Sequence, residues 1–544
     1  MKKTALIIFL TLAAVIGRAQ SAYDAFLFSE DNYEGTARSV AMGNAFTALG
    51  GDLGAVGINP AATAVAKYAQ ISFTPALTVY SNTTKGVSPY ADGTLPYFER
   101  EYKNTKAAFA LPNVGMTFYW NTNRKTGLKG VSFGFVANRT NSWNENLYAA
   151  GRNSTTTFMG SMAANATANG YRGSELNLDS AYDYYNWKDV VGYHSGMIST
   201  FGGYDDEFVG ASEIIYDRNG STEIALGGPI DQEYGRSVSG SKYEYLFNLG
   251  FNVSDFIYLG VNLGFSSMDY SYSEYFKETA IDPADFEIGL DNGQTMYFSQ
   301  MKYMYDYSVQ TSGVFGKFGV IITPGYGLRI GAAIQTPTSS TITERWQHSG
   351  ETQFTERKYD AYASSPQGED RYSFRQPYKA NLGIAYTLGQ LGVISADYEY
   401  CDYSTMKFKR SGINDGREYF NEINAEIKDI FGASHTLRAG VEVKPFSVMA
   451  VRAGYNLTTS PEMYSAWGDN LPMLFTQNAS FGLGYNSKRS FFADAACRYT
   501  FATDEYFMPY ADYIFDGDEI ASPAPEILNR KNAWKIFLTI GWRF

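Results

Sequence analysis

The sequence has few of the residues that most enzymes use for chemistry. Only 2 of its 544 residues are cysteine and only 3 are histidine, and His194, His348 and His435 lie far apart in the chain. It also lacks the His-Glu-x-x-His motif of metalloproteases. We therefore expect no enzyme activity and no bound cofactor or metal.

Long apolar runs are missing from all but the first residues. Lys2 and Lys3 precede an apolar stretch over residues 5–16, and Gly17-Arg18-Ala19 follows it. The stretch is shorter than the roughly 20 residues that a membrane-spanning helix needs. It has the layout of a secretory signal, so we predict a signal peptide over residues 1–19. A net charge of −12 argues against nucleic acid as a partner.

Aromatic residues and glycine are abundant instead, and many segments alternate between apolar and polar residues. The chain has 44 Tyr, 37 Phe and 53 Gly. In its last eleven residues every even position is large and apolar, from Trp534 to Phe544, while most odd positions are polar or small. A period of two predicts a strand with one apolar and one wet face. A mean hydropathy of −0.27 suits a barrel, in which only every second strand residue meets lipid.

The same alternation predicts fourteen strands. They cover residues 69–80, 113–121, 130–142, 242–253, 256–273, 305–322, 327–338, 371–386, 390–407, 434–444, 447–459, 477–486, 490–502 and 532–544. The connections between them are alternately long and short, as in outer-membrane barrels, which have short periplasmic turns and long external loops. The longest connection, 143–241, is expected to fold over the barrel mouth, and residues 414–431 are expected to form a short amphipathic helix on an external loop.

The fold class that follows is all-β: a transmembrane, antiparallel, up-and-down β-barrel. It would occupy residues 69–544 of the chain, after a separate N-terminal segment, 20–68. An even number of strands places both termini in the periplasm. The final strand, which ends on Phe544, is expected to be recognised by the machinery that assembles outer-membrane barrels. We expect a monomer surrounded by outer-membrane lipid and lipopolysaccharide.

Residues 20–68 do not have the strand pattern. They contain the small-residue run 37–49, which includes Gly43 and Phe46, and then Asn59-Pro60-Ala61. The local sequence over about residues 34–64 resembles the N-terminal hatch of the FadL/TodX family of outer-membrane transporters of long-chain fatty acids and other hydrophobic compounds. Members of that family are fourteen-stranded barrels with such a hatch in the lumen. The resemblance implies that Gly43, Phe46, Asn59, Pro60 and Ala61 belong to a hatch or gate. A plain turn before the first strand is the alternative for Asn59-Pro60.

The resemblance also implies a route. In the family an apolar ligand passes from external loops into the lumen and leaves sideways at a kink in the third strand. Gly130 and Gly134 lie in the third predicted strand and would permit a kink, although ordinary strand glycines are the alternative. Pro75 leaves one ladder bond of the first strand unmade, so it is expected to mark a bulge or a local opening.

Strand parity places a set of charged side chains in the lumen. These are Glu244, Arg329, Asp397, Glu399, Arg438, Glu442, Arg452, Asp494, Arg498, Lys535 and Arg543. We expect them to pair with one another or with the hatch, and an unpaired one would be able to hold a ligand's carboxylate. Cys401 is expected to face inward and Cys497 to face lipid, so the two should not form a disulfide.

The sequence therefore predicts a channel for passive uptake of a hydrophobic small molecule such as a long-chain fatty acid. Two alternatives remain open. A structural or adhesive barrel would act through its large external loops, and a general diffusion porin would have an open hydrophilic lumen. A transporter, in contrast, should have an apolar pocket against the hatch.

Overall fold

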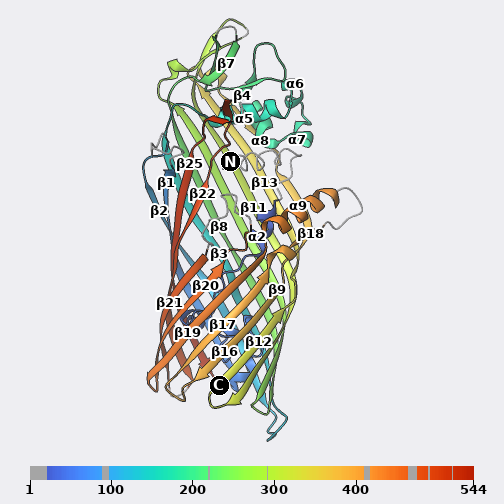
Figure 1. Ribbon diagram of the computed structural model, residues 1–544, viewed down its shortest axis with the longest axis vertical. Helices are drawn as coiled ribbons and strands as arrows, with labels where there is room; N and C mark the ends of the chain where they lie inside the picture. Colours follow the sequence, from blue (N-terminus) through green and yellow to red (C-terminus); the bar gives the residue numbers. More distant parts are fainter. Residues whose placement is uncertain are drawn as a thin grey trace.

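The computed structural model describes residues 21–87, 97–218, 221–290, 292–409, 417–463, 475–487, 490–516 and 519–544. The predicted signal peptide therefore lies outside the described residues. None of the described helices is both long enough and apolar enough to cross a membrane. Most of the chain is β-strand, and the long strands stand side by side in one upright wall (Figure 1).

The wall is a closed ring of fourteen antiparallel strands, which confirms the predicted fold class. Hydrogen-bonded pairing runs around the ring and returns from β25 to β1, where Ile71 lies opposite Trp542. Three of the ring positions are made of two consecutive pieces. In ring order the strands are β1 (Gln70–Val87), β2 (Tyr102–Asn121), β3 (Leu128–Asn153), β8 (Ile230–Val253), β9 (Ile257–Ala280), β11 (Thr295–Gly325), β12 with β13 (Leu328–Gln335 and Ser339–Phe354), β15 with β16 (Gly368–Arg375 and Lys379–Thr387), β17 with β18 (Gly392–Asp402 and Lys407–Lys409), β19 (Ala433–Phe446), β20 (Met449–Thr459), β21 (Phe475–Asn486), β22 (Phe491–Phe507) and β25 (Glu526–Arg543).

The two ends of the barrel differ in their connections, as predicted. Short turns join the strands at the end where β25 finishes, drawn at the bottom of Figure 1. One of them is the Ser254-Asp255 turn, where both residues have positive φ angles of 60° and 57°. The backbone N–H of Phe544 donates to the Ala69 carbonyl at 2.9 Å, so the last residue closes the ring at this end.

The outer face of the barrel divides into an apolar half and a polar half. Towards the short turns the outward side chains are large and apolar, including Phe247, Leu263 and Ile536. Further along the same strands the outward positions are polar, as at Ser239 and Ser271. An apolar band of this kind meets lipid in barrel proteins. The half with the apolar band therefore spans the membrane, and the other half extends beyond it.

This polar half explains where the predicted strand boundaries were wrong. β3 continues to Asn153 and β8 begins at Ile230, so the long connection covers residues 154–229 rather than 143–241. Similarly, β2 begins at Tyr102 rather than at residue 113. Where neither face of a strand meets lipid, no apolar alternation is required, and the period that marked the strands disappears.

Residues 154–229 form a cap on the polar half of the barrel (Figure 1). The cap contains α5 (Phe158–Ala168), α6 (Gly173–Leu176), α7 (Ala181–Tyr184) and α8 (Trp187–His194). It also contains two hairpins, β4–β5 (Ile198–Thr200 and Phe208–Gly210) and β6–β7 (Glu213–Arg218 and Ser221–Leu226). Phe158, Met159 and Val190 of the cap share a hydrophobic core with Tyr234 and Phe276 of the wall. This core fixes the cap to β8 and β9.

The remaining elements are small. The N-terminal segment, residues 21–69, contains α2 (Ala22–Ser29), α3 (Ala37–Ala41), the 3₁₀ turn η1 (Gly54–Gly57) and α4 (Ala62–Ala66). The amphipathic helix predicted over 414–431 is α9 (Arg417–Ile430), whose Ile423, Ile427 and Ile430 are buried in one hydrophobic cluster with Phe28 of α2. The outer hairpins contain β10 (Glu287–Gly289), β14 (Ala361–Ser364), β23 (Ile514–Asp516) and β24 (Glu519–Ser522), and the 3₁₀ turns η2 (Pro283–Asp285), η3 (Arg357–Tyr359) and η4 (Tyr403–Thr405) complete the set.

Candidate functional site: the N-terminal segment and the β2–β3 seam

The N-terminal segment lies inside the membrane-spanning half of the barrel. Most of its side chains between Glu34 and Ala64 are buried, although the segment has hardly any large residues with which to form a core of its own. Its contacts are with inward-facing residues of the wall, as where α3 packs on β22 and β21 and α4 packs on β8 and β9. The segment therefore fills the lumen at this level.

Glycines on the inner face of the wall allow the segment to come so close. A Cβ atom on Gly454 of β20 would lie 2.1 Å from the backbone N of Gly43, and one on Gly260 of β9 would lie 2.2 Å from the carbonyl carbon of Pro60. We call these wall positions the glycine belt. Its members, which all face backbone or short side chains of the segment, are Gly250, Gly260, Gly319, Gly331, Gly383, Gly440, Gly454 and Gly482. At these positions a side chain would exclude the segment.

Asn59, Pro60 and Ala61 form a bend that is bonded to the wall. The Asn59 Oδ1 atom accepts from the N–H of Ala61 at 3.0 Å, which closes the turn locally. The Asn59 Nδ2 atom donates to the Thr47 carbonyl at 2.7 Å and to the Val320 carbonyl of β11 at 3.1 Å. The Pro60 carbonyl accepts from Asn248 of β8 at 2.9 Å. The bend is thus more than a link to the first strand, because it ties two parts of the segment to two wall strands.

Gly43 and Phe46 lie on the other side of the segment. Gly43 has a φ angle of +62°, and a Cβ there would lie 2.8 Å or 2.9 Å from backbone atoms of Tyr455 and Ala439. Only glycine fits such a position. Phe46 is fully buried, and the guanidinium of Arg38 lies 5.4 Å from its ring centroid. All five predicted hatch residues are therefore in the segment that fills the lumen.

Charged side chains of the lumen pair across the wall and with the segment, as predicted. Arg452 binds Asp494 at 2.6 Å and Glu442 at 2.6 Å, and Glu442 also binds Arg38 of the segment at 2.9 Å. Arg329 donates to the Leu49 carbonyl at 2.7 Å. Buried charges need such partners, since an unpaired one is costly.

A cavity of about 600 Å³ lies between the segment and the wall. Phe26, Tyr33 and Ile58 of the segment line it, together with Lys317 and Arg438 of the wall. The lining includes both charged and apolar groups, so this cavity differs from the apolar pocket that is expected of a transporter. The Arg438 side chain is 9% exposed and binds Glu399 at 2.9 Å through Nη2. Its Nη1 atom has no hydrogen-bond partner among the described residues.

The β2–β3 boundary loses its backbone pairing part-way along both strands, and we call it the seam. From Asn121–Gly130 to Asn113–Asn138 the two strands pair regularly, and beyond Asn138 the described residues show no further β2–β3 pairing. β2 nevertheless continues to Tyr102 along β1, and β3 continues to Asn153 along β8. The seam therefore runs upward from a point that lies inside the apolar band, beside Phe109 and Leu111, which are 77% and 43% exposed.

Prolines and a register shift mark the lower end of the seam. Between Thr74 and Ala76 of β1 the register with β2 shifts, so that Pro75 lies opposite the Leu111-Pro112 pair. Neither proline has a backbone N–H to donate. In β3, a second register shift falls between Arg139 and Asn141. The register thus shifts at Pro75, whereas pairing is regular at Gly134 and shifts near Gly130 on the β8 side.

Side chains replace the missing backbone ladder above this point. From β1, the Asn82 Nδ2 atom donates to the Asn146 carbonyl at 3.3 Å, and the Thr84 Oγ1 atom donates to the Tyr148 carbonyl at 2.5 Å. On the outside, the ring of Tyr102 packs edge-on against that of Tyr148, with centroids 5.0 Å apart. The β1–β2 hairpin thus overlaps the edge of β3, and a second cavity of about 340 Å³ lies behind the overlap.

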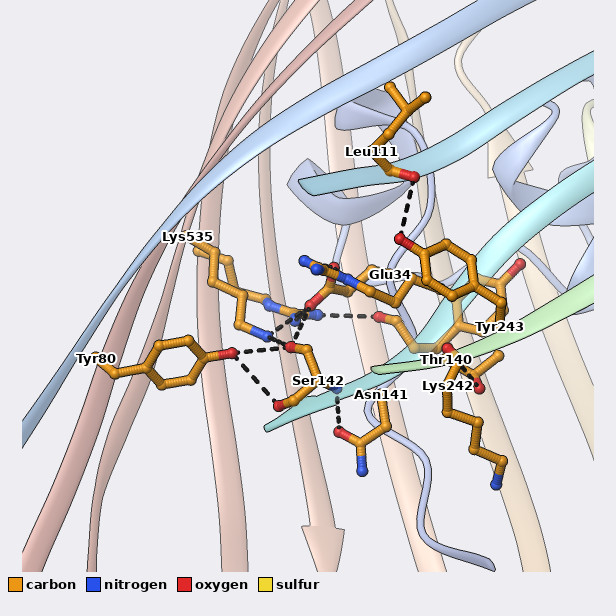
Figure 2. A network of polar contacts seen from close by, with 12 residues as sticks. Glu34, Tyr80, Leu111, Thr140, Asn141, Ser142, Lys242, Tyr243 and Lys535 are labelled. Atoms are coloured by element: carbon orange, nitrogen blue, oxygen red, sulfur yellow. Dashed lines mark hydrogen bonds and ion pairs between the residues drawn. The ribbon is translucent and has the colours of Figure 1, made fainter. Parts of the chain in front are cut away.

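The N-terminal segment supplies the remaining closure from inside. The backbone N–H groups of Asn32 and Glu34 donate to the carbonyls of Thr140 and Arg139 of β3, at 2.6 Å and 3.0 Å. Figure 2 shows the Glu34 carboxylate surrounded by the ends of wall side chains, with Lys535 and Ser142 beside it. The Glu34 oxygens lie 2.5 Å from Lys535 Nζ, 2.6 Å from Arg139 Nη2 and 3.5 Å from Arg498 Nη2.

Sequence reasoning missed the glycine belt and Glu34. Inward glycines at one level of many strands were a usable signal for the belt, because parity already assigned them to the inner face. Glu34 carries no local signal, since its partners come from β3, β22 and β25. Cys401 is buried and Cys497 half-buried, and both are free thiols, as predicted.

Comparisons with solved structures give the same architecture. The toluene transporter TodX of Pseudomonas putida is 10% identical, with a TM-score of 0.52, and the alignment covers 94% of this chain and 98% of that one. A FadL homologue of Pseudomonas aeruginosa is 13% identical, with a TM-score of 0.49, over 94% and 99% of the two chains. No known protein-family model matches the sequence, and no curated protein does. At 10% identity the likeness to the TodX structure shows the fold alone, a plugged barrel of the FadL type.

Proposed function

We propose that this protein is an outer-membrane channel for passive uptake of hydrophobic small molecules, which leave it sideways through the seam. The observation that carries the proposal is the loss of β2–β3 backbone pairing beyond Asn113–Asn138, at a level where Phe109 and Leu111 face lipid. Behind this gap lies a cavity with Tyr80, Trp143 and Tyr270 in its lining. The solved relatives named above include a toluene transporter, which is consistent with an apolar cargo.

The polar groups of the lumen narrow the choice of cargo. A pure hydrocarbon would gain little in the 600 Å³ cavity, where Lys317 and Arg438 line one side. An amphipathic acid suits it better, since its head group can meet the charged part of the lining, which includes Lys317 and Arg438, while its chain packs on Phe26 and Ile58. We therefore propose a long-chain fatty acid or a similar acid as the cargo. The gating role of Asn59, Pro60, Ala61, Phe46 and Gly43 belongs to the same proposal.

The membrane placement follows from the proposed function. We place the short turns and the C-terminal Phe544 in the periplasm and the cap outside the cell, in the lipopolysaccharide-bearing membrane, with the chain as a monomer. Recognition of the final strand by the assembly machinery remains part of this proposal. A sideways exit suits such a cargo, because the molecule passes from the lumen into lipid without crossing water.

A direct test locks the seam. In a background with Cys401→Ala and Cys497→Ala, Tyr102→Cys and Tyr148→Cys, which replace two rings in contact across β2 and β3, would be joined by a short bifunctional thiol reagent. The control pair is Ser239→Cys with Ser271→Cys, which are directly opposite in the β8–β9 ladder. Uptake of labelled palmitate by cells should fall severalfold when the seam pair is joined and should not change with the control pair. Equal uptake with both pairs joined would contradict the sideways route.

The adhesive alternative is favoured by one observation, the folded cap, which shares a hydrophobic core with β8 and β9. Extraction of the purified barrel with organic solvent and mass spectrometry separates the two functions. A recurrent amphipathic acid, absent from an unrelated barrel purified alongside, would support transport. A diffusion porin is disfavoured because the N-terminal segment fills the lumen, and little ion conductance is expected.

A further inference from the structure

The Glu34 site carries an excess of positive charge. Its three cations are Arg139, Arg498 and Lys535, whose side chains are no more than 5% exposed, and Glu34 itself is fully buried. No other carboxylate among the described residues is within ion-pair distance of these cations. In addition, the Arg498 Nε atom is buried and has no hydrogen-bond partner in the described part of the chain. One carboxylate thus serves a site that has donors for more.

The Glu34 carboxylate and the three cations belong to different parts of the fold. Glu34 belongs to the N-terminal segment, whereas Arg139, Arg498 and Lys535 belong to the wall strands β3, β22 and β25. Moving the segment would remove Glu34 and leave three buried cations without an anion. Such a state is costly unless another anion takes the place of Glu34.

The site also adjoins the seam. The Lys535 Nζ atom donates to Ser142 Oγ at 3.0 Å, and Ser142 Oγ lies 2.8 Å from the hydroxyl of Tyr80 (Figure 2). Tyr80 is on β1 and Ser142 on β3, so this chain of contacts crosses the overlap. The backbone N–H of Glu34 is bonded to β3 as well, at the point where β2 leaves it. Release of Glu34 would therefore remove contacts that hold the seam closed.

We propose that the three cations form an anion site behind the seam and that Glu34 is its internal occupant. The acid group of the cargo takes the site in exchange for Glu34, which frees residues 32–34 from β3 and lets the seam part. The exchange swaps one carboxylate for another, so no buried cation is left uncompensated at either end of the process. This inference rests on the proposed function, because it assumes a carboxylate cargo that leaves through the seam.

The test measures binding of dodecanoate to the purified full-length barrel in lipid nanodiscs, with dodecanol as the uncharged probe of equal length. Glu34→Gln should bind dodecanoate at least about tenfold more tightly than the natural protein, since the internal competitor has lost its charge. Dodecanol binding should be unchanged. Glu442→Gln is the matched control: Glu442 is also a buried carboxylate that joins the segment to the wall, through Arg38, and it is remote from the seam. It should leave dodecanoate affinity as it is.

A second variant covers the possibility that Glu34→Gln does not fold. Lys535→Gln leaves Glu34 with two arginines and should weaken dodecanoate binding about tenfold, again without effect on dodecanol. Equal dodecanoate affinity in the natural protein and both variants would overturn the anion site while leaving the proposed function intact. If neither probe binds to any form of the protein, the proposed function fails and this inference fails with it.

Discussion

The two edges of β3 differ in how they are closed. On the β8 side the backbone ladder is continuous from Leu128–Val253 to Asn153–Ile230, apart from two register shifts. On the β2 side it stops at Asn138, and the next part of the wall depends on side chains and on the N-terminal segment. β3 is thus bonded to β8 along its whole length, whereas beyond Asn138 its contact with β2 is conditional: it depends on side chains and on the N-terminal segment. Parting two strands that are joined by a backbone ladder would leave their N–H and C=O groups unpaired, whereas the described residues of β2 and β3 have no such ladder to lose beyond Asn138.

Hydrogen exchange should show the largest effect of this difference. Alternate amides of a strand point to its two neighbours. Within residues 143–150, amides that point to β8 should be protected, and those that point to β2 should exchange at least about a hundredfold faster, since only a local opening is needed. Exchange measured residue by residue in nanodiscs would show the alternation. Equal protection of the β2-facing and β8-facing amides of β3 would contradict the idea that the β2 edge is closed less firmly.

The glycine belt gives a way to displace the N-terminal segment, on which closure of the β2 edge of β3 depends. On β11, a Cβ on Gly319 would lie 1.9 Å from Asn59 Oδ1 and 2.8 Å from Pro60 Cδ, whereas the nearest atom to a Cβ on Gly316 is 3.8 Å away. Gly319→Val should therefore displace the Asn59-Pro60 bend, at a cost of about 1–3 kcal/mol or more for the overpacking. Gly316→Val, on the same strand, should be close to neutral.

Single-channel recording in planar bilayers checks this prediction. The Gly319→Val barrel should conduct ions more often than the natural protein, because its lumen is less completely filled, and the Gly316→Val barrel should behave as the natural one does. Exchange at the β2-facing amides near Arg139 and Thr140 should also rise in Gly319→Val alone. An unchanged conductance would mean that the segment does not close the lumen.

Low pH should raise the stability of the cap, which packs on β8 and β9, on the side of β3 where the backbone ladder is continuous. Burial, with a smaller contribution from the nearby Glu278 carboxylate, raises the pKa of Glu213 in the cap to about 7, although the Gly210 N–H and the Tyr513 hydroxyl oppose the shift. Burial likewise raises the pKa of Asp189 to about 6. For a raised carboxyl pKa, the folded cap holds its proton at a pH where the unfolded cap has already lost it. The contribution to stability is therefore full below the ordinary pKa and is lost as the pH rises to about 7.

The cap should consequently be more stable at pH 4.5 than at pH 8, by on the order of 2–3 kcal/mol from Glu213. Exchange of the α5 amides at a series of pH values, corrected for the intrinsic rate, would measure it. Glu213→Gln should remove roughly half of the dependence, because Asp189 contributes a shift of similar size, and it should leave the wall amides of β9 unaffected. A cap that becomes more stable with rising pH would contradict the assignment.

Prediction from sequence succeeded where lipid or local geometry dictates the residue. The Tyr243–Val253 alternation correctly gave the lower half of β8, because every second residue there must be apolar. The Asn59-Pro60 bend was found because its turn chemistry is local. Residues 230–242 were missed as strand, since their buried side chains are both polar and apolar, as at Gln232 and Tyr234, so that hydropathy does not alternate.

The parts of the site that could not be predicted depend on which strands are neighbours across the lumen. Parity correctly placed Arg498 and Lys535 inside the barrel, yet nothing in the sequence shows that both reach Glu34. The end of the β2–β3 ladder was equally hidden. Pro75 suggested a bulge, but the effect depends on Pro112 of the next strand lying opposite, and that is a matter of register.

The smallest expected effect concerns a single hydroxyl at the seam. Tyr80→Phe removes the contact with Ser142 Oγ at 2.8 Å and keeps the ring, which lies 5.6 Å from Lys535 Nζ. The seam should open more easily by about 1 kcal/mol, which is about fivefold faster exchange of the β2-facing amides of β3. Tyr272→Phe, a lumen tyrosine that is bonded to Glu274 on its own strand, is the control and should not change that exchange. If the two variants behave alike, the overlap is closed by packing, and the contrast between the edges of β3 lies in the missing ladder and the N-terminal segment alone.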